Sequence, residues 1–151
     1  MKLEFLHGTE TGSAEMLCED MVKALEGEHS CSMQSMQDAD PKALEGDTFY
    51  VVVVSTYGAG DLPFTAQPFF DRLKADKPDL SAISFAVFGL GDSSFADTFN
   101  FGSQTIQDLM IECGARKFGE RGLFDASGAD FPEDVGVPWI KDIVSQRAVA
   151  A

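Results

Sequence analysis

The sequence predicts a doubly wound α/β fold, in which a five-stranded parallel sheet of order 2-1-3-4-5 lies between two layers of helices. Strand-like segments alternate along the chain with segments whose apolar residues recur at helical spacing, and this alternation is typical of parallel sheets with right-handed crossovers. Residues 49–54 (Phe-Tyr-Val-Val-Val-Val) are apolar without alternation, as expected of a central strand covered on both faces. The length of 151 residues matches one domain, so residues 1–151 are expected to form a single unit.

The first half of the chain predicts two strands before the central one. Residues 3–6 form a short apolar strand, and residues 30–36 form a second. A helix between them is indicated by apolar residues at helical spacing: Ala14, Leu17, Cys18, Met21, Val22 and Leu25. We expect Gly27 to end this helix and residues 39–45 to include a short helical turn.

The second half continues the alternation. Helices are expected over residues 67–74 and around Ile106, Leu109, Met110 and Cys113, the latter closed by Gly114. Strands are expected over residues 84–90 and 121–124. A final helix contains Trp139, which we assign to core packing, with Ile140, Ile143 and Val144. We expect residues 147–151 to fray.

The charge balance is strongly acidic. Lys and Arg together number 11 against 25 Asp and Glu, which gives a formal net charge of -14. Binding to nucleic acid or an anionic membrane requires clustered cations, so we expect neither as a partner. An acidic protein is instead steered toward basic partners.

Cysteine usage and the lengths of the apolar runs favour a cytoplasmic protein. Cys18, Cys31 and Cys113 lack CxxC spacing, and we expect them to be buried, reduced thiols. The N-terminus has no signal-peptide pattern, and the apolar runs are too short to span a membrane. With His7 and His29 as the only histidines, a transition-metal site has few ligands. We expect no metal, and we assign His7 to a strand end rather than to a catalytic base.

Three loops are expected to meet at the carboxyl edge of the sheet, where doubly wound folds bind ligands. They span residues 8–14, 55–64 and 91–101. The first (Gly-Thr-Glu-Thr-Gly-Ser-Ala) leads into a helix and offers backbone amides and hydroxyls but no Lys or Arg. Such neutral donors favour a phosphate monoester over a triphosphate, which would require the lysine of a P-loop. The alternative is an ordinary helix start capped by Thr11 or Ser13.

The second and third loops supply glycines and aromatic rings. Tyr57 lies among small residues, where its ring can stack on a planar group. The adjacent GxG lacks the third glycine of a dinucleotide fingerprint. In the third loop we place Phe95 against a ligand, whereas Phe99 and Phe101 fit core positions. Either loop alone is compatible with an ordinary surface connection.

In order and spacing, the three loops resemble those of the flavodoxin family. The motifs are Gly-Thr-Glu-Thr-Gly-Ser-Ala-Glu at 8–15, Ser-Thr-Tyr-Gly-Ala-Gly-Asp at 55–61 and Phe-Gly-Leu-Gly-Asp-Ser-Ser-Phe at 88–95. The resemblance is greatest to short-chain flavodoxins of the MioC type and to the FMN domains of cytochrome P450 reductase and sulfite reductase. Residues 118–125 leave no room for the insertion of long-chain flavodoxins. The resemblance therefore implies the flavodoxin-like three-layer sandwich.

The resemblance also implies FMN as the cofactor. Its phosphate is expected at residues 9–14, with Glu10 taking part through its backbone, and its ring between Tyr57 and Phe95, where the reductase domains usually have Tyr in place of Phe95. The carbonyl of Gly58 would accept a hydrogen bond from N5 of the reduced flavin. The full set of expected cofactor-binding residues is Thr9, Glu10, Thr11, Gly12, Ser13, Ala14, Ser55, Thr56, Tyr57, Gly58, Gly60, Leu90, Gly91, Asp92, Phe95 and Phe99.

The implied function is one-electron transfer by a non-catalytic, monomeric carrier. It would shuttle low-potential electrons between a basic-faced flavodoxin reductase and an unidentified acceptor enzyme in transient complexes. The alternative is an FMN-dependent reductase that passes hydride from NAD(P)H to an acceptor such as a quinone, although the chain has no nicotinamide fingerprint. A receiver domain is excluded because its acidic pair and phosphoacceptor aspartate are replaced by His7-Gly8 and Ser55-Thr56.

Overall fold

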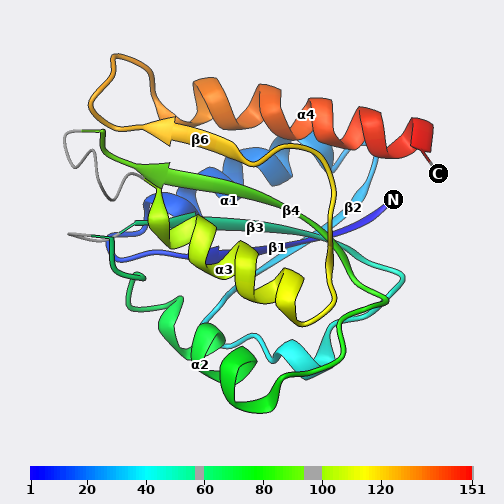
Figure 1. Ribbon diagram of the computed structural model, residues 1–151. Helices are drawn as coiled ribbons and strands as arrows, with labels where there is room; N and C mark the ends of the chain where they lie inside the picture. The colour runs from blue at the N-terminus through cyan, green and yellow to red at the C-terminus, as the bar shows by residue number, and fades with distance from the viewer. Residues whose placement is uncertain (57–59, 94–99, 151) are drawn as a thin grey trace.

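A computed structural model describes residues 1–56, 60–93 and 100–150 (Figure 1). The strands are β1 (Lys2–Gly8), β2 (Ser30–Ser35), β3 (Phe49–Ser55), β4 (Ser84–Gly91), β5 (Arg116–Lys117) and β6 (Gly122–Asp125). The helices are α1 (Ser13–Leu25), the 3-10 turn η1 (Pro41–Ala43), α2 (Gln67–Asp76), α3 (Phe101–Glu112) and α4 (Pro132–Ala150). The predicted alternation of strands and helices is confirmed.

The sheet has the predicted parallel order, β2-β1-β3-β4-β5. Its fifth position, however, is shared by two short segments. Lys117 of β5 pairs with Phe85 near the start of β4, whereas Asp125 of β6 pairs with Gly91 at its end. The sequence predicted only the second of these segments, because two residues are too few to show a strand pattern.

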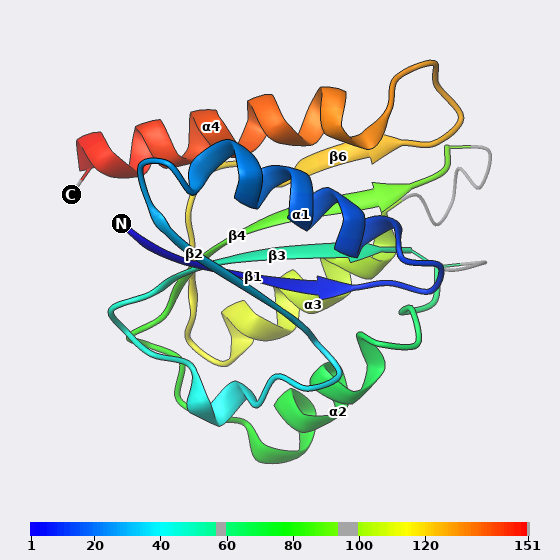
Figure 2. The same cartoon turned by 180° about the vertical axis from the view of Figure 1, so that it is seen from behind.

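Helices cover both faces of the sheet: α1 and α4 lie on one face and α2 and α3 on the other (Figures 1 and 2). In β3, Val51 and Val53 belong to the core beneath α1 and α4, and Val52 and Val54 to the core beneath α2 and α3. All residues from 49 to 54 are at most 3% exposed. This confirms that the unalternating apolar segment is a central strand with both faces covered.

The helix boundaries follow the predicted pattern closely, although α2 extends two residues beyond the predicted 67–74, to Asp76. α1 ends at Leu25 with Glu26 as its C-cap, one residue before Gly27. The prediction of a frayed tail is wrong, because α4 continues through Ala150. The guanidinium of Arg147 lies 4.9 Å from the ring centre of Phe49 and 5.2 Å from that of Phe118. These cation–π contacts hold the last turns of α4 against the sheet.

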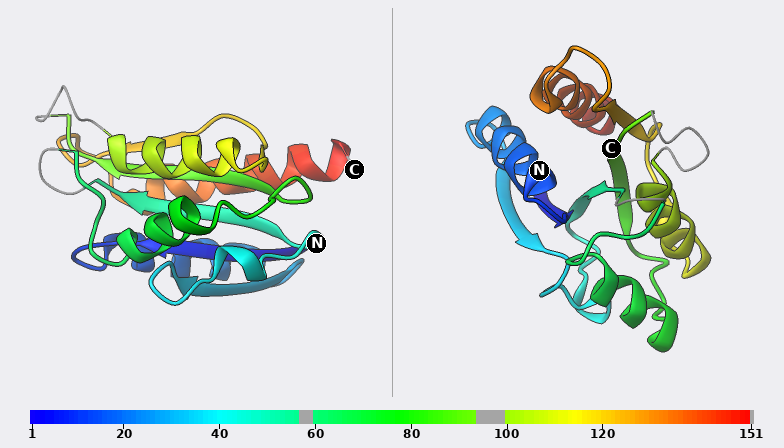
Figure 3. Two further views of the ribbon diagram at one scale, coloured as in Figure 1. Left: turned by 60° about the horizontal axis from the view of Figure 1, so that its bottom comes forward. Right: turned by 90° about the vertical axis from the view of Figure 1, so that its left-hand side faces the viewer.

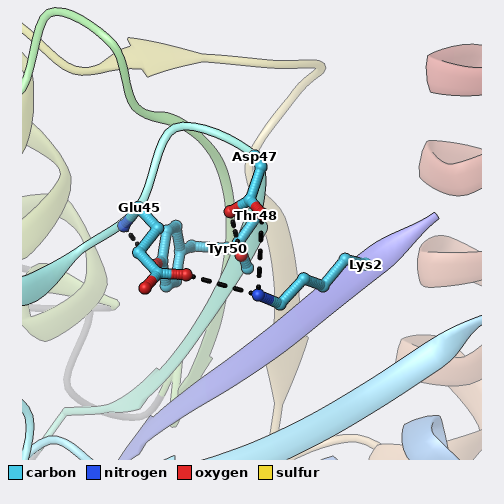
Figure 4. A network of polar contacts seen from close by, with 5 residues as sticks. All are labelled: Lys2, Glu45, Asp47, Thr48 and Tyr50. Atoms are coloured by element: carbon cyan, nitrogen blue, oxygen red, sulfur yellow. Dashed lines mark hydrogen bonds and ion pairs between the residues drawn. The ribbon is translucent and has the colours of Figure 1, made fainter.

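The N-terminus and the end of α4 lie at the end of the sheet opposite the loops that follow β1, β3 and β4 (Figure 3). At this end Lys2 contacts Glu45 at 3.3 Å and Asp47 at 3.7 Å, and the Tyr50 hydroxyl accepts a hydrogen bond from the Glu45 amide at 2.7 Å (Figure 4). The hydrogen bond to Glu45, with the nearby charge of Asp47, raises the pKa of Lys2. Because the charges are exposed, these ion pairs add little stability.

The cysteines and the tryptophan were assigned to the interior. Cys18 is buried, whereas Cys31 and Cys113 are only half-buried, and all three are free thiols. Burial raises the pKa of Cys18, so its thiol stays protonated and unreactive. Trp139 packs against the core, with its ring 5.2 Å from that of Phe88, as predicted. No helix in the described ranges is long and apolar enough to cross a membrane.

Candidate functional site

The strand register brings the predicted loops together at one edge of the sheet. Gly8 pairs with Val54, and the next residue of β3, Ser55, pairs with Leu90. Gly91 in turn pairs with Asp125 at the end of β6. The strands therefore end side by side at one edge of the sheet (Figure 3).

The first loop turns directly into α1 at a glycine. Gly12 is the N-cap of α1 with φ 95°, and its amide donates to the Thr9 hydroxyl at 2.8 Å. The alternative in which Thr11 or Ser13 caps the helix is wrong, because Gly12 occupies the cap position and has no side chain. The first amides of a helix have no intrahelical partner, so the start of α1 presents donors that its cap residue leaves unsatisfied. Of the predicted phosphate-binding residues, Ala14 is fully buried and Thr11 is exposed.

Side-chain contacts join the first loop to the segment that leads into α2. The Thr65 hydroxyl accepts a hydrogen bond from the Thr9 amide at 2.8 Å and donates to the Thr9 carbonyl at 3.0 Å. The Glu10 carboxylate accepts a hydrogen bond from the Phe64 amide at 2.7 Å. Glu10 therefore has a side-chain role that the sequence did not indicate, since we expected only its backbone to take part. Thr65 was missed because no motif marks it.

The second loop is bonded to both neighbouring strand ends. Ser55 donates to the Gly8 carbonyl at 3.3 Å. The Thr56 amide donates to the Leu90 carbonyl at 2.9 Å, and its hydroxyl accepts from the Gly102 amide at 2.8 Å. Gly60 adopts a left-handed conformation with φ 102°, which favours glycine. The predicted ring-stacking residues of this loop and the next, Tyr57 and Phe95, lie outside the described residues, as do Gly58 and Phe99.

Asn100, the residue directly before α3, is buried and adopts a left-handed backbone conformation. It is the N-cap of α3 with φ 58°, its side chain is 1% exposed, and neither its Oδ1 nor its Nδ2 has a hydrogen-bond partner among the described atoms. A Cβ on Gly91 would lie 3.0 Å from Asn100 Cγ. A glycine at this predicted site position therefore allows the start of α3 to pack on the end of β4.

Phe101 is 44% exposed, so its assignment to the core is wrong. It is the first residue of α3, and its side chain is partly exposed to solvent there. The buried residue of this turn is Asn100 instead. An asparagine tolerates the left-handed backbone that Asn100 adopts here, so the residue type at this position is compatible with such a helix start.

A fourth segment, after β6, is bonded to the third loop. The Asp125 carboxylate accepts hydrogen bonds from the Ser93 amide at 2.9 Å and from the amide and hydroxyl of Ser127 at 2.9 Å and 2.8 Å. The hydroxyls of Ser93 and Ser127 lie 2.6 Å apart. These bonds hold the pKa of Asp125 well below its usual range. The carboxyl-edge rule that selected three loops also applies to this strand and would have found Asp125.

His7 lies within β1, where it is 5% exposed and its Nδ1 has no hydrogen-bond partner among the described atoms. Burial lowers its pKa, against the opposing charges of Glu15, Glu19 and Asp38. A neutral imidazole inside a strand fits the predicted structural assignment rather than that of a catalytic base.

The fold and these loops define the class of protein: a doubly wound α/β protein in which a glycine-capped helix follows a first loop without Lys or Arg. The flavodoxin family model matches residues 6–136. The chain belongs to the flavodoxin family.

Individual relatives agree with the family match. Protein MioC of Escherichia coli (strain K12) is 30% identical over 138 residues, which are 91% of this chain and 92% of that protein. NADPH-dependent diflavin oxidoreductase 1 of Aspergillus fumigatus is 31% identical over 93% of this chain, but the match covers only 23% of that enzyme. The solved structure of a mutant flavodoxin from Pseudomonas aeruginosa superposes with a TM-score of 0.83 at 30% identity, covering 96% of this chain and 97% of that chain.

Family membership identifies FMN as the cofactor and electron transfer as the general role. The donor set fits this cofactor, because the start of α1 offers amides and hydroxyls suited to a phosphate monoester. The first loop has no Lys or Arg, and its glycine cap leaves room at the helix start, since a Cβ on Gly12 would meet nothing within 4 Å.

Proposed function

We propose that this chain is a single-domain, short-chain flavodoxin that carries single low-potential electrons between a reductase and an acceptor enzyme. The observation that supports it most is the glycine-capped start of α1 at the edge of the sheet where β1, β3 and β4 end side by side. FMN bound there supplies the redox chemistry, and the protein supplies position and electrostatics. Residues 9–14 would hold its phosphate, with Ser55, Thr56, Gly60, Leu90, Gly91 and Asp92 along its ring.

The acidic composition supports a low potential. The formal net charge is -14, and adding an electron to the cofactor adds negative charge within that field. One unit charge about 8 Å away costs about 2 kcal/mol at an effective dielectric constant near 20. This corresponds to about 90 mV for one electron, and salt screens the contribution of exposed carboxylates.

The surface around the loops supports docking of a basic partner. Glu15, Asp61 and Glu133 are exposed and belong to the first turn of α1, the second loop and the first turn of α4. The apolar side chains of Phe64 and Phe131 are 68% and 66% exposed near the same edge. Exposed apolar side chains together with exposed carboxylates suit a transient complex with a basic-faced reductase. We propose a monomeric, cytoplasmic carrier.

The alternative function is hydride transfer from NAD(P)H. The match to NADPH-dependent diflavin oxidoreductase 1 of Aspergillus fumigatus covers only 23% of the length of that enzyme. The described loops of this chain contain no nicotinamide fingerprint.

Two measurements test the proposal. The purified protein should take up FMN with a flavin absorption spectrum, and it should not oxidise NADPH in air without an added reductase. A preparation that binds no FMN, or that oxidises NADPH alone, overturns it.

The docking surface has its own test. The rate of electron transfer from a basic flavodoxin reductase should fall as salt is added, because screening weakens electrostatic steering. Replacing Glu15 and Glu133 together by Gln should lower this rate at low salt, with Glu28→Gln beyond the other end of α1 as the matched control. A rate that is independent of salt contradicts the charged docking surface.

A further inference from the structure

Arg121 connects the interrupted fifth position of the sheet to the third loop. It lies in the four residues between β5 and β6. Its Nη1 donates hydrogen bonds to the Asn100 carbonyl at 2.8 Å and to the Ser103 hydroxyl at 2.8 Å. Both acceptors belong to the start of α3, where Asn100 and Ser103 are at most 1% exposed.

The turn that Arg121 binds is packed on the strand ends of the site. Gly102 donates its amide to Thr56 at 2.8 Å, and a Cβ on Gly102 would lie 2.7 Å from the Ser55 carbonyl oxygen. The same turn packs on Gly91 through Asn100. A shift of the α3 start would therefore move groups that contact both the second loop and the end of β4.

Arg121 has no carboxylate bonded to it among the described contacts; its bonds go to a carbonyl and a hydroxyl. Burial disfavours the charged guanidinium, and the charge of Asp108 favours it. Hydrogen bonds from a charged donor are stronger than neutral ones, and the planar guanidinium holds its acceptors in a fixed geometry. The group is thus suited to fixing a backbone position rather than to balancing a charge.

We propose that Arg121 is a positioning residue for the third loop. By holding the Asn100 carbonyl and the Ser103 hydroxyl, it fixes the start of α3, and with it the end of the loop that begins at Gly91. Near the start of the same loop, the Ser93 amide donates to the Asp125 carboxylate at 2.9 Å. Arg121 precedes β6 directly and Asp125 ends it, so both contacts come from the same segment of the chain. This inference rests on the proposed FMN function, because its consequence is the fit of the loop to the cofactor.

The first test uses the apoprotein and needs no cofactor. In Arg121→Met, amide hydrogen exchange at Gly102 and Ser103 should be about tenfold faster than in the unmodified protein, because bonds from a charged donor are lost. Amides in the middle of α1 should be unchanged. Ser103→Ala removes one of the two acceptors and should give a smaller acceleration, which keeps the proposal testable if Arg121→Met folds poorly. Unchanged exchange at Gly102 and Ser103 in both variants overturns the proposal.

The second test measures FMN affinity by titration of the apoprotein and the midpoint potentials of the holoprotein. Arg121→Met should weaken FMN binding about tenfold and shift the potentials. Arg116→Met, which removes a positive charge from exposed β5 near the start of β4, is the matched control and should leave both unchanged. Arg121→Lys keeps the charge without the planar geometry and should resemble Arg121→Met.

The outcomes separate this proposal from the proposed function. If Arg121→Lys restores the affinity and the potentials, charge rather than geometry is responsible, and the positioning role is wrong. The same conclusion follows if Arg116→Met has as large an effect as Arg121→Met. If the unmodified protein binds no FMN, the proposed function fails, and faster exchange in Arg121→Met would then support only the fixing of the α3 start.

Discussion

The carboxylate of Glu10 accepts a hydrogen bond from the backbone amide of Phe64 at 2.7 Å, across 54 residues of sequence. Together with the two bonds between Thr9 and Thr65, it ties the first loop to the segment before α2. The loop expected to bind phosphate is therefore held from outside as well as by its own turn.

Glu10→Ala should weaken FMN binding about three- to tenfold, because the first loop loses a bond from Phe64 to a charged acceptor. The measurement is fluorescence titration of the apoprotein with FMN. Glu15→Ala removes the same charge from the exposed first turn of α1 and serves as the control. Equal effects of the two variants would show that charge, not the bond to Phe64, determines the affinity.

Gly12→Ala should lower both FMN affinity and thermal stability, with a loss of about 1 kcal/mol from the left-handed backbone alone. A Cβ at this position would meet nothing within 4 Å, so steric contact is not the cause. Gly27→Ala is the matched control, because Gly27 also has open space around its Cβ position and lies outside the positive-φ residues. It should be neutral or slightly stabilising, and a loss in Gly27→Ala equal to that in Gly12→Ala would refute the backbone explanation.

Asp125→Ala should lower the melting temperature at pH 7, and the difference from the unmodified protein should shrink in acid. The folded-state pKa of Asp125 is depressed below the usual 3.8 by hydrogen bonds from Ser93 and Ser127. Its contribution is therefore complete above about pH 4 and is lost as the pH falls through the folded-state value. Thermal unfolding between pH 7 and pH 2 measures it, with Asp130→Ala as an exposed control. A difference that does not change with pH would rule out the carboxylate as its source.

Lys77→Gly should stabilise the protein by about 1 kcal/mol, which corresponds to about 2–4 °C in melting temperature. Lys77 is the C-cap of α2 with φ 42° and ψ 56°, a left-handed conformation in which glycine avoids the steric cost of a Cβ. Lys74→Gly, within the last turn of the same helix, should instead destabilise by a similar amount. If both variants lose stability, Lys77 is not strained.

The sequence predicted the features that depend on local pattern. The unbroken apolar segment at 49–54 identified the central strand, and the glycine-containing segments after β1, β3 and β4 indicated the edge of the sheet where the cofactor is expected. The family resemblance was carried by three motifs in register and is confirmed. The apolar segment and the three loop motifs are each a short continuous stretch of the sequence, so each can be recognised without knowledge of contacts between distant residues.

What the sequence did not reveal depends on contacts between distant residues. Arg147 extends α4 because its guanidinium reaches Phe49 and Phe118, and no pattern near the C-terminus encodes those rings. Thr65 and Arg121 act on loops that lie 56 and 21 residues away. Phe101 is exposed at the start of α3, beside the left-handed Asn100, and its exposure depends on how that helix start packs on the strand ends.

The division of the outer strand into β5 and β6 also affects how the molecule meets other copies of itself. An uninterrupted edge strand presents a row of free backbone groups on which a second chain can add. Here one boundary of the sheet consists of pieces of two and four residues, separated by a stretch that turns toward α3 through Arg121. So short a template disfavours edge-to-edge assembly at this boundary, because it offers a second chain few free backbone groups to pair with.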